Sequence, residues 1–415
     1  MEKTKKSKKR LRTARELSEI VGEFYLECMQ ARTDGKPVGW MPPMNGAIEL
    51  FYAMDLQPVF PENWSPICAA FGLSPGNFAV AESMGYSPDL CGYLRNIIGY
   101  VNGPMKEGDT TLGGLPEPDL LISPGGGCSP VMKIFHALER RFPEAKVFTA
   151  DLPQVAIEEI QDYHVAYARS ELNRLVNFLT ETTGRKLDYD RLKEVVALSD
   201  KACELWDRIM AYRCHIPSPF SAAEIGIMFV MVTRQGTRIA VDYLQKVLEE
   251  LEERVQQGIG VIEDEKIRLF WDNIPLWYNM GLFNYFEKMN GVVVAETYSA
   301  AWSLRLGTDD PLDALALKSL KSYPMVSCVS IKNRKEMVLK ACKEYAIDGV
   351  IFHRNKSCAP ITLGQMDIKK ALESELDIPS VIIDADHMDQ GNFSTAQFQT
   401  RVDAFMEMLH ARKFK

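Results

Sequence analysis

A strand, a glycine turn, a helix and a second strand follow one another without interruption between residues 119 and 151. The apolar run Asp119-Leu120-Leu121-Ile122-Ser123 has the length of a strand, and it leads directly into Pro124-Gly125-Gly126-Gly127-Cys128. Apolar residues at helical spacing follow over 131–141, and a second strand is predicted over 146–151. Such a unit joins two parallel strands through a right-handed crossover. The sequence therefore predicts an α/β fold.

The same alternation of short strands and helices occurs on both sides of a long helical region. Further strands are predicted at 38–41 and 57–62 before this region, and at 267–271, 291–295, 349–353 and 379–384 after it. Helices are predicted over 14–34, 46–54, 157–183, 190–212, 222–234, 238–257 and 334–345, with a last one that begins at a capping box of Ser394 and Gln397.

This pattern predicts two Rossmann- or flavodoxin-like parallel-sheet lobes with an intervening helical subdomain. The predicted boundaries are 1–13 for a basic flexible tail, 14–153 for an N-terminal lobe with Cys91 and Cys128, 154–265 for the helical subdomain, and 266–415 for a C-terminal lobe with Cys358.

Composition excludes several classes of protein. The 415 residues are 46% hydrophobic and 25% charged, which is typical of a globular chain and not of a disordered one. No apolar stretch reaches the roughly 18 residues that cross a bilayer. The net charge of −8 argues against nucleic acid as a partner. The one basic run, over 3–12, precedes glutamates and no apolar segment, so it predicts a solvated tail or a contact with an acidic partner, and no secretory signal.

Nine cysteines in a chain without a predicted secretory signal indicate thiols in a reducing, cytoplasmic compartment. Six of them lie mid-helix or beside apolar residues, where a cysteine usually fills the core. These six are Cys28, Cys68, Cys203, Cys214, Cys328 and Cys342.

The other three cysteines lie where strands are predicted to end or helices to begin. Cys128 ends the glycine turn, Cys358 follows the strand predicted to end at His353, and Cys91 falls in the first turn of a helix predicted to start at Ser87. Ligands of α/β sheets bind at the carboxyl ends of strands, and helix N-termini favour thiolates. Three thiols from separate loops suit an iron–sulfur cluster with one open site. CxxC spacings are absent, however, and each cysteine alone is equally well explained as structural.

A set of short motifs in fixed order then gives a family resemblance. The motifs are Gly39-Trp40, Pro61-Glu62-Asn63, residues 81–87, Asp89-Leu90-Cys91, the glycine turn at Cys128, residues 353–358, Asp384-Ala385-Asp386 and residues 393–401. Together they resemble the catalytic subunits of the 2-hydroxyacyl-CoA dehydratase/benzoyl-CoA reductase family, from about Val38 to the last helix.

The resemblance implies a heterodimer of homologous subunits, each with a [4Fe-4S] cluster on three cysteines. Here these would be Cys91, Cys128 and Cys358. One subunit would leave an iron open to the thioester carbonyl of an acyl-CoA, and a separate ATP-hydrolysing iron–sulfur activator would supply one electron. The resulting ketyl radical would expel the hydroxyl group of an (R)-2-hydroxyacyl-CoA. This chain has no GxxxxGK[ST] loop, so ATP hydrolysis is expected of the partner.

One departure from the family pattern keeps other functions open. Dehydratase subunits usually carry a hydroxyl residue shortly after the Gly-Trp pair, and Met41-Pro42-Pro43-Met44 offers none. This favours the reductase branch, in which an aromatic acyl-CoA such as benzoyl-CoA is reduced. A subunit that only relays electrons and a metal-free scaffold are the further alternatives.

Two more residues are candidates for catalysis. Glu62 stands in the family's Pro-Glu-Asn position and is predicted to have a raised pKa as an acid or base, or else to cap the following turn. His353 could donate a hydrogen bond to the substrate or a cluster sulfur, or be a structural residue. Three acidic residues lie near the last strand, and capping or turn formation is predicted for them rather than metal binding: Asp384, Asp386 and Asp389. Four aromatic residues are predicted to pack in the core or to form the wall of a dry pocket: Trp271, Trp277, Tyr278 and Trp302.

Overall fold

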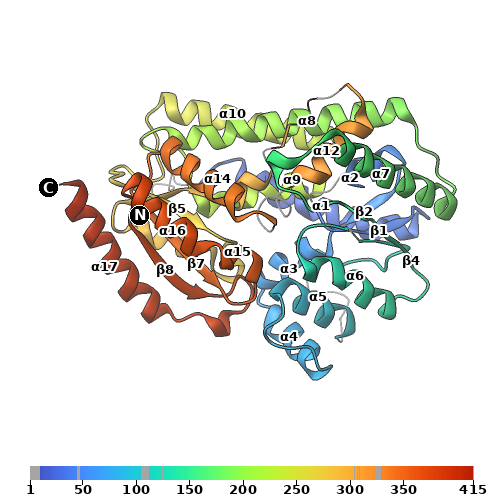
Figure 1. Ribbon diagram of the computed structural model, residues 1–415, viewed down its shortest axis with the longest axis horizontal. Coiled ribbons are helices and arrows are strands. Elements are labelled where there is room, and N and C mark those ends of the chain that lie inside the picture. The colour runs from blue at the N-terminus through green and yellow to red at the C-terminus, as the bar shows by residue number, and fades with distance from the viewer. Residues whose placement is uncertain are drawn as a thin grey trace, which may run out of the picture.

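The fold is built on two parallel sheets of four strands each (Figure 1). The computed structural model describes residues 10–43, 47–103, 112–123, 125–302, 304–305, 307, 309–322 and 329–414. Both sheets are covered by helices, as parallel sheets require, because both of their faces are apolar. The predicted α/β class is therefore confirmed.

The first sheet has the strand order β2-β1-β3-β4. Its strands are β1 (Val38–Trp40), β2 (Gln57–Val59), β3 (Leu120–Ser123) and β4 (Lys146–Thr149). The helices of this part of the chain are α1 (Ala14–Thr33), α2 (Ala47–Ala53), α3 (Pro61–Ala70), α4 (Ser74–Ser83), α5 (Gly92–Asn102) and α6 (Ser129–Arg141). Gly39 is required at its position, since a Cβ atom there would lie 2.2 Å from the ring of Phe51.

The second sheet has the strand order β6-β5-β7-β8. Its strands are β5 (Ile267–Asp272), β6 (Gly291–Glu296), β7 (Gly349–Asn355) and β8 (Ser380–Ala385). Around it lie the short helices η4 (Trp277–Leu282) and α11 (Phe283–Glu287) and the helices α14 (Ile331–Glu344), α15 (Ala359–Leu363), α16 (Gln365–Leu376) and α17 (Thr395–Lys413). Ser394 caps α17 by accepting a hydrogen bond from the amide of Gln397, as predicted.

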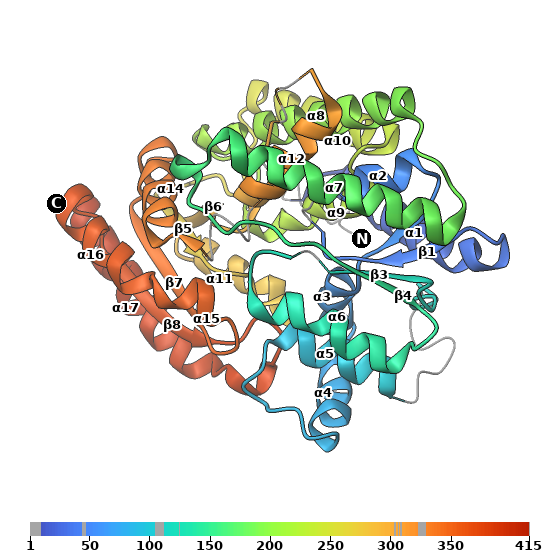
Figure 2. The same ribbon diagram turned by 45° about the vertical axis from the view of Figure 1, so that its right-hand side comes forward.

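Residues 154–265 are all described and contain no strand. Their main helices are α7 (Asp162–Thr183), α8 (Tyr189–Ala211), η3 (Ala222–Ile227), α9 (Met228–Arg234) and α10 (Arg238–Gln256). The long helices α8 and α10 lie side by side along one edge of the molecule (Figures 1 and 2). This region also receives α12 (Pro311–Lys321), which packs on α7 and α8 although it follows β6 in sequence.

A buried ion pair stabilises the packing of α12 against the helices of this region. Lys318 of α12 reaches Glu49 of α2 with its Nζ 2.5 Å from the carboxylate, and both side chains are almost inaccessible to solvent. Ser199 of α8 donates a second hydrogen bond to the same carboxylate. Helices from three regions of the sequence therefore share one buried polar cluster, because a buried charge requires several partners.

The structure differs from the sequence prediction at several places. Strand β2 ends at Val59, so Glu62 lies in the first turn of α3 and not in a strand. Helices α4, α12 and α16 were not predicted. Cys328 and residues 1–9 lie outside the described residues. No described helix has the length and apolar character needed to cross a membrane.

The prediction of a solvated tail over 1–13 is wrong for its last three residues. Leu11 is 2% exposed, and its amide donates to Glu224 of η3 at 2.7 Å. The amides of Arg12 and Thr13 donate to Glu250 of α10. Two buried or half-buried carboxylates thus hold this segment against the helical region.

Stability should depend on the ionisation of Glu224. Burial raises the pKa of this carboxyl from 4.5 to about 7, so the folded state holds a proton that the unfolded state has released between these pH values. Folding stability should therefore fall as pH rises from 4.5 to 7. Because glutamine does not ionise, Glu224→Gln should raise the free energy of unfolding by about 1 kcal/mol at pH 8 and change it little at pH 4.5.

Denaturant unfolding at the two pH values measures this difference. Glu252→Gln, at an exposed position of α10, is the control and should show no pH-dependent gain. An equal effect of Glu224→Gln at pH 4.5 and pH 8 would contradict the prediction.

Candidate active site

Each of the three cysteines selected from the sequence is the N-cap residue of a helix. Cys91 precedes α5, Cys128 precedes α6 and Cys358 precedes α15. All three are half-buried, whereas Cys28, Cys68, Cys203 and Cys342 are fully buried. The first amides of a helix have no partner inside it and can donate to an anion. At Cys91 the backbone amides of Tyr93 and Leu94 lower the pKa of the thiol, against the larger effect of burial.

Two local details of the prediction are corrected. Ser87 does not cap a helix, because residues 87–90 form a turn in which the Ser87 hydroxyl accepts from the amide of Asp89. The helix begins five residues later, so Cys91 itself occupies the cap. Strand β7 continues past His353 to Asn355, which brings Cys358 within three residues of the strand end.

The residues next to Cys91 and Cys358 contact each other where the lobe of the first sheet touches the lobe of the second. The amide of Gly92 donates to the hydroxyl of Ser357 at 3.1 Å, and these residues directly adjoin the two cysteines. A Cβ atom on Gly92 would lie 2.6 Å from Met388, so the backbone approaches this closely because the residue is glycine. Arg95 of α5 adds an ion pair to Asp389 at 3.1 Å. We call these contacts the interlobe seam.

Cys128 stands at the start of a helix that packs on the helix of Cys91. Its helix α6 packs on α5, which begins at Cys91, and both helices start on the side of their lobe that faces α15 (Figure 2). Within the described ranges, no group of three His, Cys, Asp or Glu side chains is close enough to hold a single metal ion. Ligands of an iron–sulfur cluster bind different iron atoms and stand farther apart, so this finding concerns mononuclear sites.

The surroundings of Cys91 suit a bound cation. Burial raises the pKa of its thiol to about 12, and the carboxylates of Glu62 and Asp386 raise it further. A thiolate in the acidic surroundings of Cys91 therefore needs positive charge from a metal centre. Three half-buried thiols at helix starts have the chemistry that an iron–sulfur cluster requires of its ligands.

Glu62 lies beside this group of thiols. Its side chain is half-buried in the first turn of α3, and burial raises the pKa of its carboxyl to about 7. The direction agrees with the expectation from sequence. A carboxyl with this pKa can accept and donate a proton near neutrality.

Two tyrosines that the sequence analysis missed complete the site. Tyr93 accepts a hydrogen bond from Trp277 Nε1 at 2.6 Å, and the ring of Tyr298 packs edge to face on Trp277 with centroids 5.8 Å apart. Tyr298 in turn lies within electrostatic reach of Glu62, Cys91 and Cys358. Tyr298 comes two residues after β6, so the rule that ligands bind at the carboxyl ends of strands could have selected it.

His353 is fully buried in β7. Its Nδ1 atom lies 2.7 Å from the carbonyl of Ile274, and its ring packs on Trp271. Burial lowers the pKa of this imidazole, which is therefore neutral at pH 7. These contacts are those of a structural residue, and a contact with substrate stays a prediction.

Two of the three acidic residues near β8, Asp386 and Asp389, have the capping and turn roles that the sequence favours. Asp386 accepts hydrogen bonds from the amides of Met388 and Ser357, and Asp389 accepts one from Gly391. Asp384 forms an exposed ion pair with Arg354.

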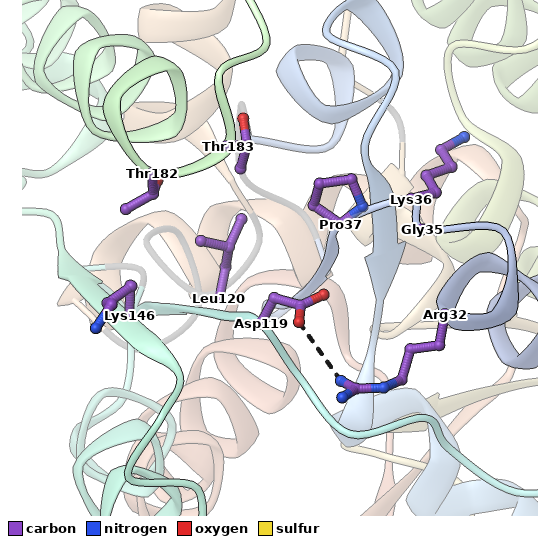
Figure 3. Close-up of a pocket in the computed structure, with 9 residues that line it drawn as sticks. All are labelled: Arg32, Gly35, Lys36, Pro37, Asp119, Leu120, Lys146, Thr182 and Thr183. Atoms are coloured by element: carbon purple, nitrogen blue, oxygen red, sulfur yellow. Dashed lines mark hydrogen bonds and ion pairs between the residues drawn. The ribbon is translucent and has the colours of Figure 1, made fainter.

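Two cavities lie outside this group of residues. One, of about 370 Å³, opens at the amino ends of β1, β3 and β4, on the edge of the sheet opposite the cysteines (Figure 3). Two of its three cations, Arg32 and Lys36, are paired with Asp119 and Asp55. The other, of about 440 Å³, has no charged residue in its lining, and Trp277 contributes to its wall.

Comparison with known proteins agrees with this geometry. The family described as 2-hydroxyglutaryl-CoA dehydratase, D-component, matches residues 44–409. The chain belongs to this family. It is an enzyme subunit of the 2-hydroxyacyl-CoA dehydratase or benzoyl-CoA reductase type.

Three relatives indicate how far the similarity extends. The chain is 28% identical to the (R)-phenyllactyl-CoA dehydratase alpha subunit of Clostridium sporogenes, over 96% of this chain and 95% of the relative. It is 27% identical to the (R)-2-hydroxyisocaproyl-CoA dehydratase alpha subunit of Clostridioides difficile, over 96% of both chains. A benzoyl-CoA reductase subunit of Thauera aromatica is 28% identical, over 82% of this chain and 81% of the relative.

Proposed function

We propose that this chain is the substrate-binding subunit of an ATP-activated (R)-2-hydroxyacyl-CoA dehydratase, with a [4Fe-4S] cluster on Cys91, Cys128 and Cys358. The observation that carries the proposal is the interlobe seam, which holds Cys91 beside Cys358 and Glu62 in acidic, half-buried surroundings. Alpha subunits of dehydratases match almost the full length of the chain, which supports the dehydratase branch.

The residues of the site would divide the work as follows. The three thiolates hold the cluster, and the first amides of α5 stabilise the charge on Cys91. When bound, the cluster supplies a Lewis acid and a one-electron conduit for ketyl chemistry at a thioester carbonyl. Glu62 exchanges a proton with the substrate. The aromatic side chains of Tyr93 and Trp277 exclude water from this side of the pocket.

A benzoyl-CoA reductase-type activity is the second candidate, and one feature favours it. Met41 and Pro42 directly follow β1 and are buried, and neither carries a hydroxyl group. An aromatic acyl-CoA loses no hydroxide during reduction, so the enzyme would not need a hydroxyl side chain at this position. A relay subunit without a substrate of its own is the third arrangement within the same family.

The proposed division of labour predicts that the chain alone is inactive. Because it has no lysine-containing phosphate loop, the purified chain should hydrolyse no ATP and convert no acyl-CoA. Addition of a homologous second subunit and an ATP-hydrolysing iron–sulfur activator should start turnover under anaerobic conditions.

The assay should offer a 2-hydroxyacyl-CoA and benzoyl-CoA in parallel. Formation of an enoyl-CoA supports the dehydratase, and formation of a dienoyl-CoA supports the reductase. Turnover by the isolated chain would refute the two-component proposal.

A further inference from the structure

Helix α15, which begins at Cys358, has only five residues and is tied to the ends of two strands. A helix of this length is not stable by itself, so its position depends on its contacts. The amide of Thr362 donates to the carbonyl of Cys358 at 3.2 Å, and its hydroxyl donates to the carbonyl of Asn355, at the end of β7, at 3.1 Å. Asn273, which follows β5, donates to the same hydroxyl at 3.3 Å. Thr362 therefore links Cys358 to both strand ends.

A buried arginine holds the same helix at the preceding residue. The guanidinium of Arg334, on α14, donates through Nη1 to the carbonyl of Ile361 and through Nη2 to the carboxylate of Asp272, the last residue of β5. The side chains of Arg334 and Asp272 are both fully buried. One planar group thus bridges the helix and the strand, which a lysine ammonium cannot do with the same geometry.

The carboxylate of Asp272 is fixed in turn by further donors. Thr297, which directly follows β6, donates to Oδ1 at 2.7 Å, and Gln365 of α16 donates to Oδ2 at 2.8 Å. Gln365 also donates to the carbonyl of His353 in β7 at 2.9 Å. Such a buried network, with several donors on one carboxylate, is rigid. The position of α15 is therefore set by the carboxyl ends of β5, β6 and β7.

We propose that Arg334 and Thr362 are positioning residues for Cys358, which hold α15 so that the thiol stays where it can bind iron. This inference rests on the proposed function, because it assigns the thiol to a cluster. Helices α5 and α6, which follow Cys91 and Cys128, have 11 and 13 residues and pack on several neighbouring elements. Helix α15 is little longer than one turn, so Cys358 is the thiol that needs support from side chains.

Alkylation of the iron-free full chain, followed by peptide mass spectrometry, tests the positioning without a cluster. In Arg334→Lys and in Thr362→Val, Cys358 should react about three- to tenfold faster than in the wild type, because loss of a hydrogen bond lets α15 open more often. Cys128 lies in the first lobe, so its rate is the internal reference and should not change. The same variants, purified anaerobically with iron, should release it to a chelator faster by a similar factor.

Arg213→Lys is the matched control. Arg213, in η2 (Tyr212–Cys214), is also fully buried, and it bridges the carboxylate of Glu296, the last residue of β6, and the carbonyl of Ser221. Neither partner belongs to α15, so this variant should change neither the alkylation of Cys358 nor the release of iron.

Wild-type alkylation rates in Arg334→Lys and Thr362→Val, or an equal acceleration in Arg213→Lys, would overturn the inference while the proposed function stands. Faster alkylation with unchanged iron release would overturn the role of these residues toward the cluster. A wild-type chain that binds no iron would overturn the proposed function, and the alkylation rates would still decide whether Cys358 is held as described. If Arg334→Lys fails to fold, Thr362→Val decides by the same comparison, because valine keeps the shape of the side chain.

Discussion

Substitution of Cys91 or Cys358 by serine is expected to remove the iron from anaerobically purified protein and to abolish turnover. The wild-type chain should contain about four irons. Both cysteines adjoin the hydrogen bond between Gly92 and Ser357, so each supplies a ligand from a different lobe. A serine hydroxyl ionises far less readily than a thiol and cannot replace it as a ligand for iron. Iron analysis and the brown absorbance of the cluster measure the result.

Variants of the other cysteines give this experiment its controls. Cys128→Ser should behave like the two seam variants, because Cys128, at the start of α6, is the proposed third ligand. Cys203→Ser and Cys342→Ser should retain iron, since both thiols are buried in the core away from the site. Equal iron content in all five variants would show that the cluster is held elsewhere or is absent.

Glu62→Gln should lower turnover about 100-fold or more and leave the iron content unchanged. Glutamine keeps the size and most of the hydrogen-bonding capacity of the side chain, but it cannot exchange a proton. The expected loss is that of a general acid or base. Burial places the pKa of Glu62 at about 7, where both protonation states are populated at neutral pH. Turnover of the reconstituted complex with the accepted acyl-CoA measures the effect.

Glu224→Gln is a stringent control for this result. Burial also raises the pKa of Glu224 to about 7, but this residue holds the N-terminal segment through the amide of Leu11. Its substitution should change stability and not turnover. Wild-type rates in Glu62→Gln would return that residue to a structural role in the first turn of α3.

The parallel sheets could be predicted because each strand is a short apolar run between glycine or proline turns. The position of helix α12 in the fold could not be predicted from sequence. Its partners α7 and α8 belong to a region about a hundred residues or more earlier in the chain. The start of α5 was also misplaced. Ser87 and Pro88 have the composition of a helix start, but a turn precedes the true cap at Cys91.

The candidate site was partly accessible from sequence. Cysteines at strand ends and helix starts could be selected by the chemistry of thiolates, and Glu62 by its family position. Tyr93 and Tyr298 could not be joined to them in advance, because both contact Trp277, and the hydrogen bond from Trp277 to Tyr93 spans 184 residues of sequence. Local patterns identify side chains suited to a site, whereas the contacts between lobes decide which of them meet.

The interlobe seam also determines when, during synthesis of the chain, the candidate site can be completed. Gly92 and Ser357, which hold Cys91 beside Cys358, are 265 residues apart in sequence. During synthesis the first lobe leaves the ribosome long before the second, so neither lobe alone contains the complete site. Insertion of any group that needs both cysteines must therefore wait until the chain is nearly finished.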